Sequence, residues 1–313
     1  MIWLGAGSPE IDPIRPEITA GMPPCPGSAE AKAAALGADV DALSPAWLRG
    51  ECPAAFRPPL RDVLLRRAPL WLRLQAPGAG AVRQEFEANG WPWQESALLP
   101  GALRLPPRGM DVVRTRAYEA GLVEIQDLGS QLILAGSPPA PGGRWLDACA
   151  GAGGKALQLA ALLGESGVVT ARDSRPAALA ELTARAARAG LGARIRVGDP
   201  ADPDGGFDGV LVDAPCTGSG TWRRFPHLKW TTKPEAPERF ARIQLRLLRE
   251  NAGRVRPAGL LVYSTCSLCS SENEAVARDF LSAEPGFKLE EQRPLLPQEH
   301  DGDGFFVARF RRA

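Results

Sequence analysis

Histidine, net charge and long apolar runs are all scarce in this chain of 313 residues. Its 37 basic and 36 acidic residues nearly cancel, which excludes a wholesale polycation, so any nucleic-acid binding must depend on local charge. No apolar run approaches the roughly 18 residues that span a bilayer. The first residues lack a basic segment followed by an apolar core, so we expect no signal peptide and a cytoplasmic protein without membrane partners.

Potential zinc ligands are also few, and the spacing of the cysteines does not indicate a disulfide framework. Cys266 and Cys269 have CxxC spacing, but a zinc site needs a second pair of ligands, and His227 and His300 lie far apart in the sequence. We therefore expect no metal site. The six cysteines are too dispersed for the dense framework of a small secreted domain, and they fit a reducing compartment.

The periodicity of the sequence divides the chain into three segments. Residues 1–45 are rich in Pro, Gly and Ala and show little periodicity, so we expect loose structure there. Residues 46–120 indicate short helices, a strand at 69–75, a helix at 81–90 and short extended pieces, which together predict a small α/β module. Residues 121–313 form a larger unit in which strands and helices alternate.

This larger unit predicts an α/β fold with a doubly wound, mainly parallel sheet. Apolar runs predict strands at 144–150, 167–173, 193–199, 207–215 and 259–267. Helical periodicity predicts helices at 153–164, 175–190, 234–255 and 271–284. The last helix opens with an S-x-x-E pattern, Ser271 to Glu274, which predicts a capping box. Two extended segments, 286–292 and 303–310, predict an antiparallel hairpin at one edge of the sheet.

Two cysteines stand at the ends of predicted strands, in Asp213-Ala-Pro-Cys216 and in Ser264-Thr-Cys266. In an open α/β sheet, the carboxyl ends of the strands form the edge where ligands bind. Two thiols at such an edge suggest covalent chemistry with a nucleophile and a partner. The alternative is that both are small buried hydrophobic residues, which is the usual fate of a free cysteine.

A glycine-rich loop follows the first strand of the larger unit, in the sequence Asp147-Ala-Cys-Ala-Gly-Ala-Gly-Gly-Lys155. Glycines let the backbone approach a ligand closely, and the amides at the start of the next helix favour a carboxylate or phosphate. The spacing fits neither the dinucleotide fingerprint nor the P-loop, so a tight turn without a ligand is the alternative.

Acidic residues follow three successive strands at Asp173, Asp199 and Asp213. An acid about 20 residues beyond a glycine loop is the expected partner of ribose hydroxyls, and Asp173 has this position. Asp199 would then face an adenine amino group. Each acid can instead cap the helix that follows it, but three in register favour a cofactor that contains a nucleoside.

Four stretches of the sequence carry a specific pattern: QDLGSQL from Gln126, DACAGAGGK from Asp147, DAPCTGSGTWRRFPHLKW from Asp213 and YSTCSLCSSENE from Tyr263. They closely resemble the RsmB/Sun family of RNA cytosine-5 methyltransferases, which use S-adenosylmethionine. The similarity extends from about residue 44 to the end of the sequence. It implies a class I, Rossmann-like methyltransferase fold with a seven-stranded sheet and helices on both faces, preceded by a small RNA-binding module.

The resemblance also assigns catalytic roles. Carbon 5 of cytosine is a poor nucleophile, so a thiolate must first add to carbon 6, and the resemblance gives this role to Cys266. It implies that Cys216 assists the release of product and that Asp213 hydrogen-bonds the base or stabilises its protonated ring. Lys155 would activate a thiol or orient the base, with a solvated lysine as the alternative.

The implied cofactor site combines the glycine-rich loop with the strand-end acids. The resemblance places Gly151 and Gly153 near the methionine part of S-adenosylmethionine, Asp173 at the ribose and Asp199 near the adenine. The full set of implied cofactor residues is Cys149, Ala150, Gly151, Gly153, Gly154, Lys155, Asp173, Asp199 and Asp213.

Two residues depart from the family pattern, and one has no role in it. The usual proline of the loop is Ala152 here, so we expect a less rigid turn. The aspartate that is common in the P-D-[IL]-[KR]-W stretch is His227, while Lys229 and Trp230 are kept. Cys269 is an extra thiol near the proposed nucleophile, and we expect it to serve packing.

Local basic charge makes an RNA substrate plausible. Residues 221–257 contain ten Lys or Arg against three Glu, directly after the Cys216 motif. Cations interleave there with aromatic rings, a mixture suited to phosphates and stacked bases: Arg223, Arg224 and Lys229 with Trp222, Phe225 and Trp230. Four arginines at helical spacing predict a basic stripe, with a solvated helix face as the alternative: Arg239, Arg242, Arg246 and Arg249. Candidates for RNA backbone contacts in the small module are Arg61, Arg66, Arg67 and Arg73.

The sequence thus predicts a monomeric enzyme that methylates RNA, with ribosomal RNA favoured over tRNA as the substrate. A catalytically silent RNA-binding or ribosome-assembly protein on the same fold is a further alternative. Retention of both thiols argues against it, because a silent protein has no chemical need for either. A nicotinamide oxidoreductase is disfavoured by the loop spacing and by the two thiols.

Overall fold

The structure, a computed structural model, describes residues 27–75, 78–106, 110–198 and 205–313. Its larger sheet contains β5 (Arg144–Asp147), β6 (Val168–Ala171), β7 (Ile195–Val197), β8 (Phe207–Asp213), β9 (Val255–Thr265), β10 (Phe287–Leu295) and β11 (Phe305–Arg312). The seven strands have the spatial order β10-β11-β9-β8-β5-β6-β7. This order brings the carboxyl ends of β8, β5 and β6 together at one edge of the sheet.

The pairing in this sheet is mainly parallel, as predicted. Each neighbouring pair from β9 through β8, β5 and β6 to β7 runs in parallel. The chain then forms the predicted antiparallel hairpin of β10 and β11. β11 lies between β10 and β9 and pairs antiparallel with both, so the sheet ends in an antiparallel edge.

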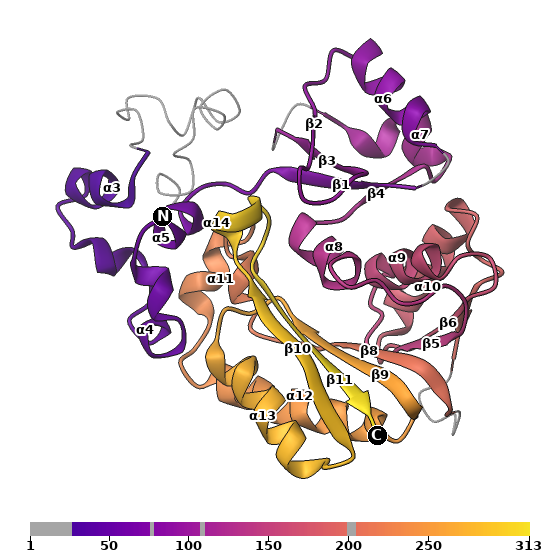
Figure 1. The fold of residues 1–313 in the computed structure, drawn as a ribbon. Helices are drawn as coiled ribbons and strands as arrows, with labels where there is room; N and C mark the ends of the chain where they lie inside the picture. Colours follow the sequence, from indigo (N-terminus) through magenta and orange to yellow (C-terminus); the bar gives the residue numbers. More distant parts are fainter. Residues whose placement is uncertain (1–26, 76–77, 107–109, 199–204) are drawn as a thin grey trace.

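Helices cover both faces of the sheet, which confirms the predicted α/β class (Figure 1). One face carries α8 (Leu128–Ala135), α9 (Gly154–Leu163) and α10 (Pro176–Arg188), and the other carries α12 (Ala236–Ala252) and α13 (Glu274–Ala283). Successive strand residues enter opposite cores because side chains alternate along a strand. Trp145 packs with the first group of helices and Leu146 with the second.

A smaller sheet lies beside the first group of helices (Figure 1). Its strands are β1 (Leu70–Leu74), β2 (Gln94–Glu95), β3 (Ala102–Leu105) and β4 (Val123–Ile125), in the antiparallel order β2-β3-β1-β4. The helices α6 (Ala79–Ala88) and α7 (Arg116–Glu119) accompany it. β4 completes this sheet from beyond residue 120, where we placed the end of the small module, and it sets Glu124 opposite Arg73.

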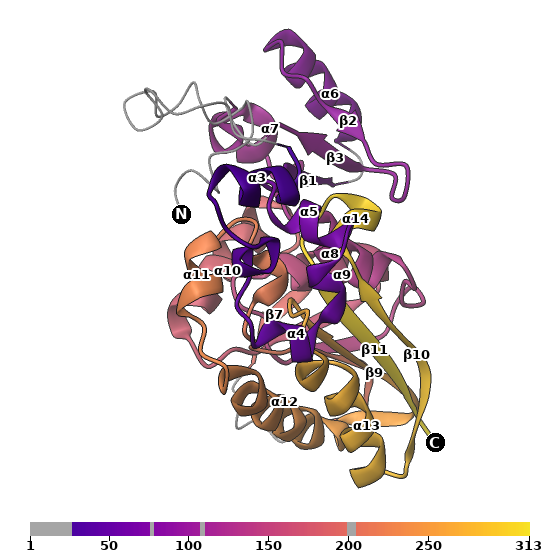
Figure 2. The same cartoon turned by 90° about the vertical axis from the view of Figure 1, so that its left-hand side faces the viewer.

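Short helices from the N-terminal part pack against the loops that follow β8 and β9 (Figure 2). They are α3 (Ala29–Ala35), η1 (Val40–Leu43), α4 (Leu48–Glu51), η2 (Pro53–Phe56) and α5 (Leu60–Leu64). Phe56 and Leu60 share one apolar cluster with Trp222 and Leu268. Of residues 1–45, where we expected loose structure, 1–26 lie outside the described residues, and the rest contain α3 and η1.

The predicted capping box at Ser271 is wrong. Residues Ser270–Glu272 form the short 3-10 helix η5, and α13 begins only at Glu274, after Asn273. The Glu272 side chain is fully buried and turns toward the loop after β8, so its segment cannot continue as a regular helix start. Asn273 is also engaged elsewhere, because its amide donates to the Ser267 carbonyl at 3.0 Å and accepts from the Thr265 hydroxyl at 2.6 Å.

The other short helices of the described residues lie in the segments between the longer helices and strands. They are η3 (Val112–Arg114), η4 (Ser219–Thr221), α11 (Pro226–Thr231) and α14 (Pro297–His300). Among the described residues, no helix has both the length and the apolar character needed to cross a membrane.

Candidate active site

The loops after β8 and β9 bring Cys216 and Cys266 together. The two strands are parallel neighbours, with Asp213 opposite Ser264, so their carboxyl ends meet at one edge of the sheet. The sulfur atoms lie 3.3 Å apart, and both residues are partly exposed. A substrate can therefore reach the pair, which speaks against the alternative of two buried packing residues.

The Cys216 thiol lies in a setting that opposes its ionisation. The hydrogen bond with Cys266, together with burial of the thiol, holds the pKa of Cys216 well above its usual value. Cys216 therefore remains a protonated thiol, which is a hydrogen-bond donor and a weak nucleophile.

A buried carboxylate, which the sequence reasoning missed, ties the two cysteine loops together. Glu272 accepts hydrogen bonds from the Thr217 amide at 2.9 Å and from the Ser267 hydroxyl at 2.6 Å. The Gln244 side chain of α12 donates to the same carboxylate at 3.1 Å and to the Pro215 carbonyl at 2.9 Å. Burial raises the pKa of Glu272 despite these bonds. An acid six residues after Cys266 was the available signal, but it was included in the predicted helix.

Asp213 and Lys155 form an ion pair next to the thiols. Lys155 comes from the first turn of α9, and its ammonium lies 2.7 Å from one carboxylate oxygen of Asp213. The Ser264 hydroxyl donates to the other oxygen at 2.8 Å. Lys155 is buried, so the alternative of a solvated lysine is wrong. Its ammonium pairs with Asp213 rather than with a thiol, which favours a role in orienting this carboxylate.

The glycine-rich loop between β5 and α9 turns through two left-handed positions. Gly151 has φ +52° and Gly153, which precedes α9, has φ +90°. A Cβ atom at Gly153 would lie 2.7 Å from the Leu182 side chain, so only glycine fits there. The Gly151 amide donates to Asp173 at 2.8 Å, which draws the loop toward the end of β6.

Asp173 itself is strongly hydrogen-bonded. Burial opposes its ionisation, but hydrogen bonds from the Arg175 side chain, the Arg175 amide and the Gly151 amide outweigh it and lower the pKa of Asp173. The carboxylate is thus ionised and available as an acceptor for hydroxyl groups. Asp199, the acid predicted after the next strand, lies outside the described residues.

These residues surround a cavity of about 860 Å³ at the sheet edge. Seven of the predicted cofactor residues line it: Cys149, Ala150, Gly151, Gly154, Lys155, Asp173 and Asp213. Gly153 shapes the turn but does not line the cavity. The far wall comes from α12, through Ile243, Arg246 and Glu250, which the sequence reasoning did not assign to this site.

Comparisons with known proteins agree with this geometry. Residues 134–311 match the family described as 16S rRNA methyltransferase RsmB/F. The chain is 36% identical over 293 residues to ribosomal RNA small subunit methyltransferase B of Xylella fastidiosa, which covers 86% of this chain and 68% of that protein. The protein of the same name from Salmonella arizonae is 30% identical over 291 residues, 87% of this chain and 67% of the relative. The chain belongs to the RsmB/F family.

Solved structures show the same fold. The crystal structure of PH0851 aligns with a TM-score of 0.78 and 27% identity, over 86% of this chain and 66% of that one. NSun6 from Pyrococcus horikoshii, solved with SFG, aligns with a TM-score of 0.73 and 19% identity, over 81% of this chain and 93% of that one. The predicted RsmB/Sun membership is confirmed, and it excludes the nicotinamide oxidoreductase.

The cofactor of this methyltransferase family is S-adenosylmethionine, and the cavity fits it. Asp147 is fully buried at the end of β5, and its Oδ2 atom has no hydrogen-bond partner in the described structure. Burial, and next the charge of Asp213, raises the pKa of Asp147 to about 7. An acceptor left unsatisfied in this way suits the ammonium group of the cofactor's methionine part. Asp147 is thus a candidate cofactor residue that the sequence reasoning passed over, although it begins the quoted loop.

The basic residues that follow Cys216 are engaged within the protein, contrary to their predicted role in RNA binding. Arg223 is buried and pairs with Asp301 at 2.8 Å, and Arg224 pairs with Asp127 and Asp303, each at 2.6 Å. Lys229 donates to the Leu43 carbonyl at 2.7 Å, and burial lowers its pKa to about 8. Trp222 is buried as well, whereas Phe225 and Trp230 remain 49% and 40% exposed. Two of the three aromatic residues in the predicted RNA-binding surface are therefore exposed.

The candidate arginines of the small module also divide into buried and exposed side chains. Arg61 and Arg73 are buried, so the prediction that they contact RNA is wrong. Arg73 donates to Gln126 at 2.7 Å and to Gln75 at 2.9 Å, and burial lowers its pKa to about 10. Arg66 and Arg67 are exposed.

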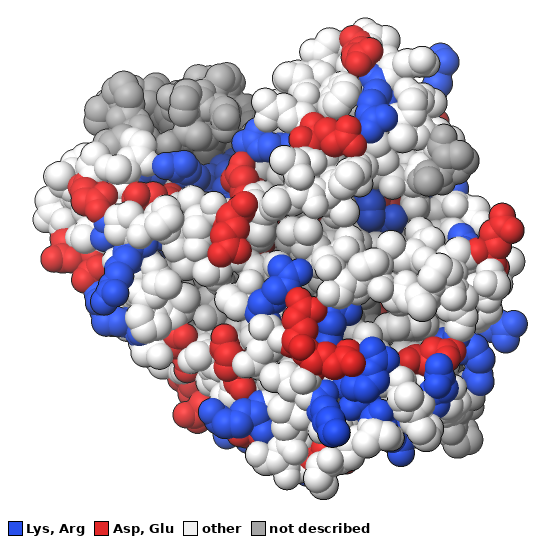
Figure 3. All heavy atoms as spheres, viewed as in Figure 1, with Lys and Arg blue, Asp and Glu red and all other residues white. Residues whose placement is uncertain are grey.

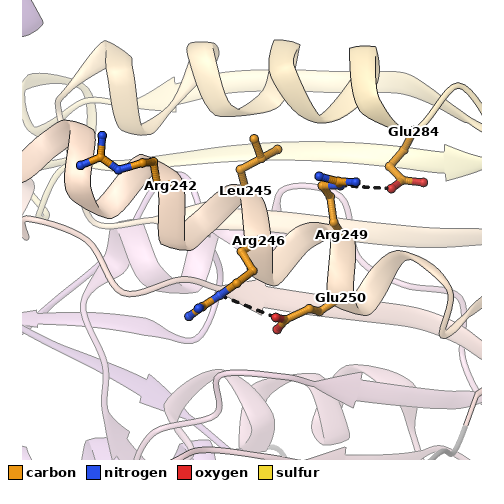
Figure 4. A pocket seen from close by; sticks show the side chains of 6 residues that line it. All are labelled: Arg242, Leu245, Arg246, Arg249, Glu250 and Glu284. Atoms are coloured by element: carbon orange, nitrogen blue, oxygen red, sulfur yellow. Dashed lines mark ion pairs between the residues drawn. The ribbon is translucent and has the colours of Figure 1, made fainter.

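The predicted arginine stripe lies on the exposed face of α12 (Figure 4). Arg246 approaches Glu250, and Arg249 approaches Glu284, each at 3.6 Å. Half of the stripe is thus balanced by glutamates, which favours the alternative of a solvated helix face. Figure 3 likewise shows Lys and Arg interspersed with Asp and Glu over the face that it draws.

Cys269 packs in the interior and is no partner of Cys266 in a metal site. It is fully buried, and burial raises its pKa to about 12. Within the described part of the chain, no group of three or more His, Cys, Asp or Glu could hold a metal ion.

Proposed function

We propose that the protein transfers a methyl group from S-adenosylmethionine to carbon 5 of a cytosine in RNA, through a covalent bond between Cys266 and the base. The observation that carries this proposal is the pair of thiols 3.3 Å apart, in the loops that follow Asp213 and Ser264, while the Asp213–Lys155 ion pair lines the cofactor cavity. Two relatives named ribosomal RNA small subunit methyltransferase B support ribosomal RNA as the substrate class.

The first step is the attack of the Cys266 thiolate on carbon 6. The new carbon–sulfur bond pushes the electrons of the C5–C6 double bond toward carbon 5 and the ring, which makes carbon 5 nucleophilic. The ring nitrogen N3 takes up a proton from solvent as these electrons move, and Asp213, fixed by Lys155 and Ser264, hydrogen-bonds this protonated ring. S-adenosylmethionine, when bound, supplies the electrophilic methyl group.

The last step restores the aromatic base. A base removes the carbon 5 proton, the electron pair re-forms the C5–C6 double bond, and the sulfur of Cys266 leaves. Cys216, a protonated thiol 3.3 Å from this sulfur, donates a hydrogen bond to it as it departs and so assists release.

The exposed rings after the Cys216 loop are the expected contacts for RNA bases. The target atom lies within a base, so the nucleotide must be unpaired or flipped out of a helix. Phe225 and Trp230 offer flat apolar faces to such unstacked nucleotides. Arg66 and Arg67 are exposed cations that suit the phosphates of the same strand.

Two single variants, compared with wild-type protein, test the chemistry with cellular RNA and labelled cofactor. Cys266→Ala abolishes the formation of 5-methylcytosine, while wild-type protein and Cys269→Ala, the matched control with a buried thiol, both support it. Nucleoside analysis of the digested RNA identifies the product. Undiminished methylation by Cys266→Ala, or a methyl group on another atom, would refute the proposal.

A further inference from the structure

A buried carboxylate of the small sheet holds two arginines of the larger unit. Glu124 of β4 is almost completely buried, with a side-chain exposure of 1%. Arg185 donates to one of its oxygens through Nη2 at 2.8 Å and Nε at 3.2 Å, and Arg188 donates to the other at 2.7 Å. A buried ion of this kind is costly unless it is fully paired, so the three side chains are fixed relative to one another.

Arg185 reaches further than Arg188. Its remaining terminal nitrogen, Nη1, donates to the Ala152 carbonyl at 2.7 Å. Ala152 lies between Gly151 and Gly153 in the loop that lines the cofactor cavity. One guanidinium therefore joins the small sheet to the cofactor loop, and its orientation is set by Glu124.

The cofactor loop needs such support in this protein. Gly151 and Gly153 must both hold positive φ values, and glycine has more backbone freedom to lose than any other residue. The residue between them is Ala152, which has no ring to fix its backbone as a proline would. The planar fork of Arg185 provides a restraint on the carbonyl of the same residue.

We propose that Arg185 is a positioning residue of the cofactor loop. Braced by Glu124, it holds the Ala152 carbonyl and thereby keeps Gly151 and Gly153 in the conformation that lines the cavity. The proposal concerns the binding of S-adenosylmethionine alone and does not depend on the RNA substrate or on the attacked atom.

Arg188 offers a matched control. It pairs with the same carboxylate from the same helix, and its guanidinium covers the Tyr118 ring at 4.0 Å instead of reaching the cofactor loop. Arg185→Met and Arg188→Met each remove one pair from Glu124, so thermal unfolding should show similar losses of stability. Only Arg185→Met removes the bond to Ala152.

The test measures S-adenosylmethionine binding to the full chain by calorimetry, without RNA. Arg185→Met is expected to weaken binding about tenfold, the effect of one charge-assisted hydrogen bond, and Arg188→Met less than about twofold. Wild-type affinity in Arg185→Met, or an equal loss in Arg188→Met, would overturn the proposal. Because RNA is absent, failure of cytosine methylation would leave this result unaffected.

A second variant separates loop restraint from general damage. Ala152→Pro adds a covalent restraint on φ, so the double variant Ala152→Pro/Arg185→Met is expected to bind S-adenosylmethionine several-fold more tightly than Arg185→Met. Ala152→Pro alone should bind as well as wild type. A double variant as weak as Arg185→Met would show that Arg185 does not act by restraining the loop.

Discussion

Asp147, the candidate partner of the cofactor's ammonium group, is expected to lower the stability of the fold at neutral pH. Its carboxyl group is buried at the end of β5, and its pKa is raised from 3.8 to about 7. Between these values the folded protein binds the proton more tightly than the unfolded chain does. The free energy of unfolding therefore falls as the pH rises from about 4 to about 7, by at most about 4 kcal/mol for this shift.

Asp147→Asn should therefore raise the melting temperature at about pH 8, change it little at about pH 4, and weaken the binding of S-adenosylmethionine. Scanning calorimetry at the two pH values and a binding titration measure these effects. Asp208→Asn provides a control of opposite sign. Burial opposes ionisation of Asp208, but hydrogen bonds from the Arg144 amide and the Arg256 side chain lower its pKa, so this variant should lose stability at neutral pH. If Asp147→Asn bound the cofactor normally, the role assigned to Asp147 would be wrong.

At the scale of elements, the two cysteine loops depend on η5. Glu272 reaches from this short helix to Thr217 in one loop and to Ser267 in the other, so its carboxylate sets the separation of the thiols. The side chain lies deeper than the thiols and does not line the cofactor cavity. Its loss should therefore impair methyl transfer and spare cofactor binding.

Glu272→Ala is expected to reduce the rate of methyl transfer about 100-fold, because a displacement near 1 Å at the reacting atoms costs this much. S-adenosylmethionine affinity should stay within about twofold of wild type. Glu274→Ala, an exposed acid two residues away, is the control and should have wild-type kinetics. A Glu272→Ala enzyme with normal turnover would show that the loops hold their register without this carboxylate.

Helix α11 gives the second prediction at this scale. Phe225 precedes this helix, Trp230 lies in its last turn, and both remain exposed, while the neighbouring Arg223 and Arg224 are engaged within the protein. Replacing both rings by alanine should weaken single-stranded RNA binding at least about tenfold, since stacking contributes about 1–3 kcal/mol per base. Fluorescence anisotropy at constant salt measures the affinity, with Leu289→Ala, an exposed apolar side chain on β10, as control. Unchanged RNA affinity in the double variant would locate the bases elsewhere.

The elements of the larger unit could be read from the sequence because each depends on local pattern. Buried parallel strands are continuous apolar runs, and the helices between them keep a regular period, so β5 to β9 and the helices α9, α10 and α12 appeared where expected, whereas the short helix α11 was not predicted. The start of α13 failed because a long-range bond of Glu272 to Thr217 overrides the capping pattern at Ser271. The prediction that Arg223 and Arg224 bind RNA failed for a similar reason. Their acidic partners lie about eighty residues or more away in the sequence.

For the whole molecule, the sheet edge unites contributions from distant parts of the chain. The cavity residues come from the loops after β5, β6 and β8 and from α12, and the N-terminal helices pack behind the cysteine loops. The small sheet reaches the same site through Glu124 and Arg185. Topology alone predicts that strand ends meet, but the pairing of side chains across modules, such as Glu124 with Arg185, needs the folded structure.

The central claim is that Cys266 carries the base while Cys216 releases it. The most direct measurement is the trapping of a covalent adduct when Cys216→Ala is incubated with RNA and S-adenosylmethionine, detected on a denaturing gel and located by mass spectrometry. We predict an adduct joined through Cys266, which disappears in Cys216→Ala/Cys266→Ala. Rapid turnover by Cys216→Ala without an adduct, or an adduct that persists in the double variant, would contradict the account.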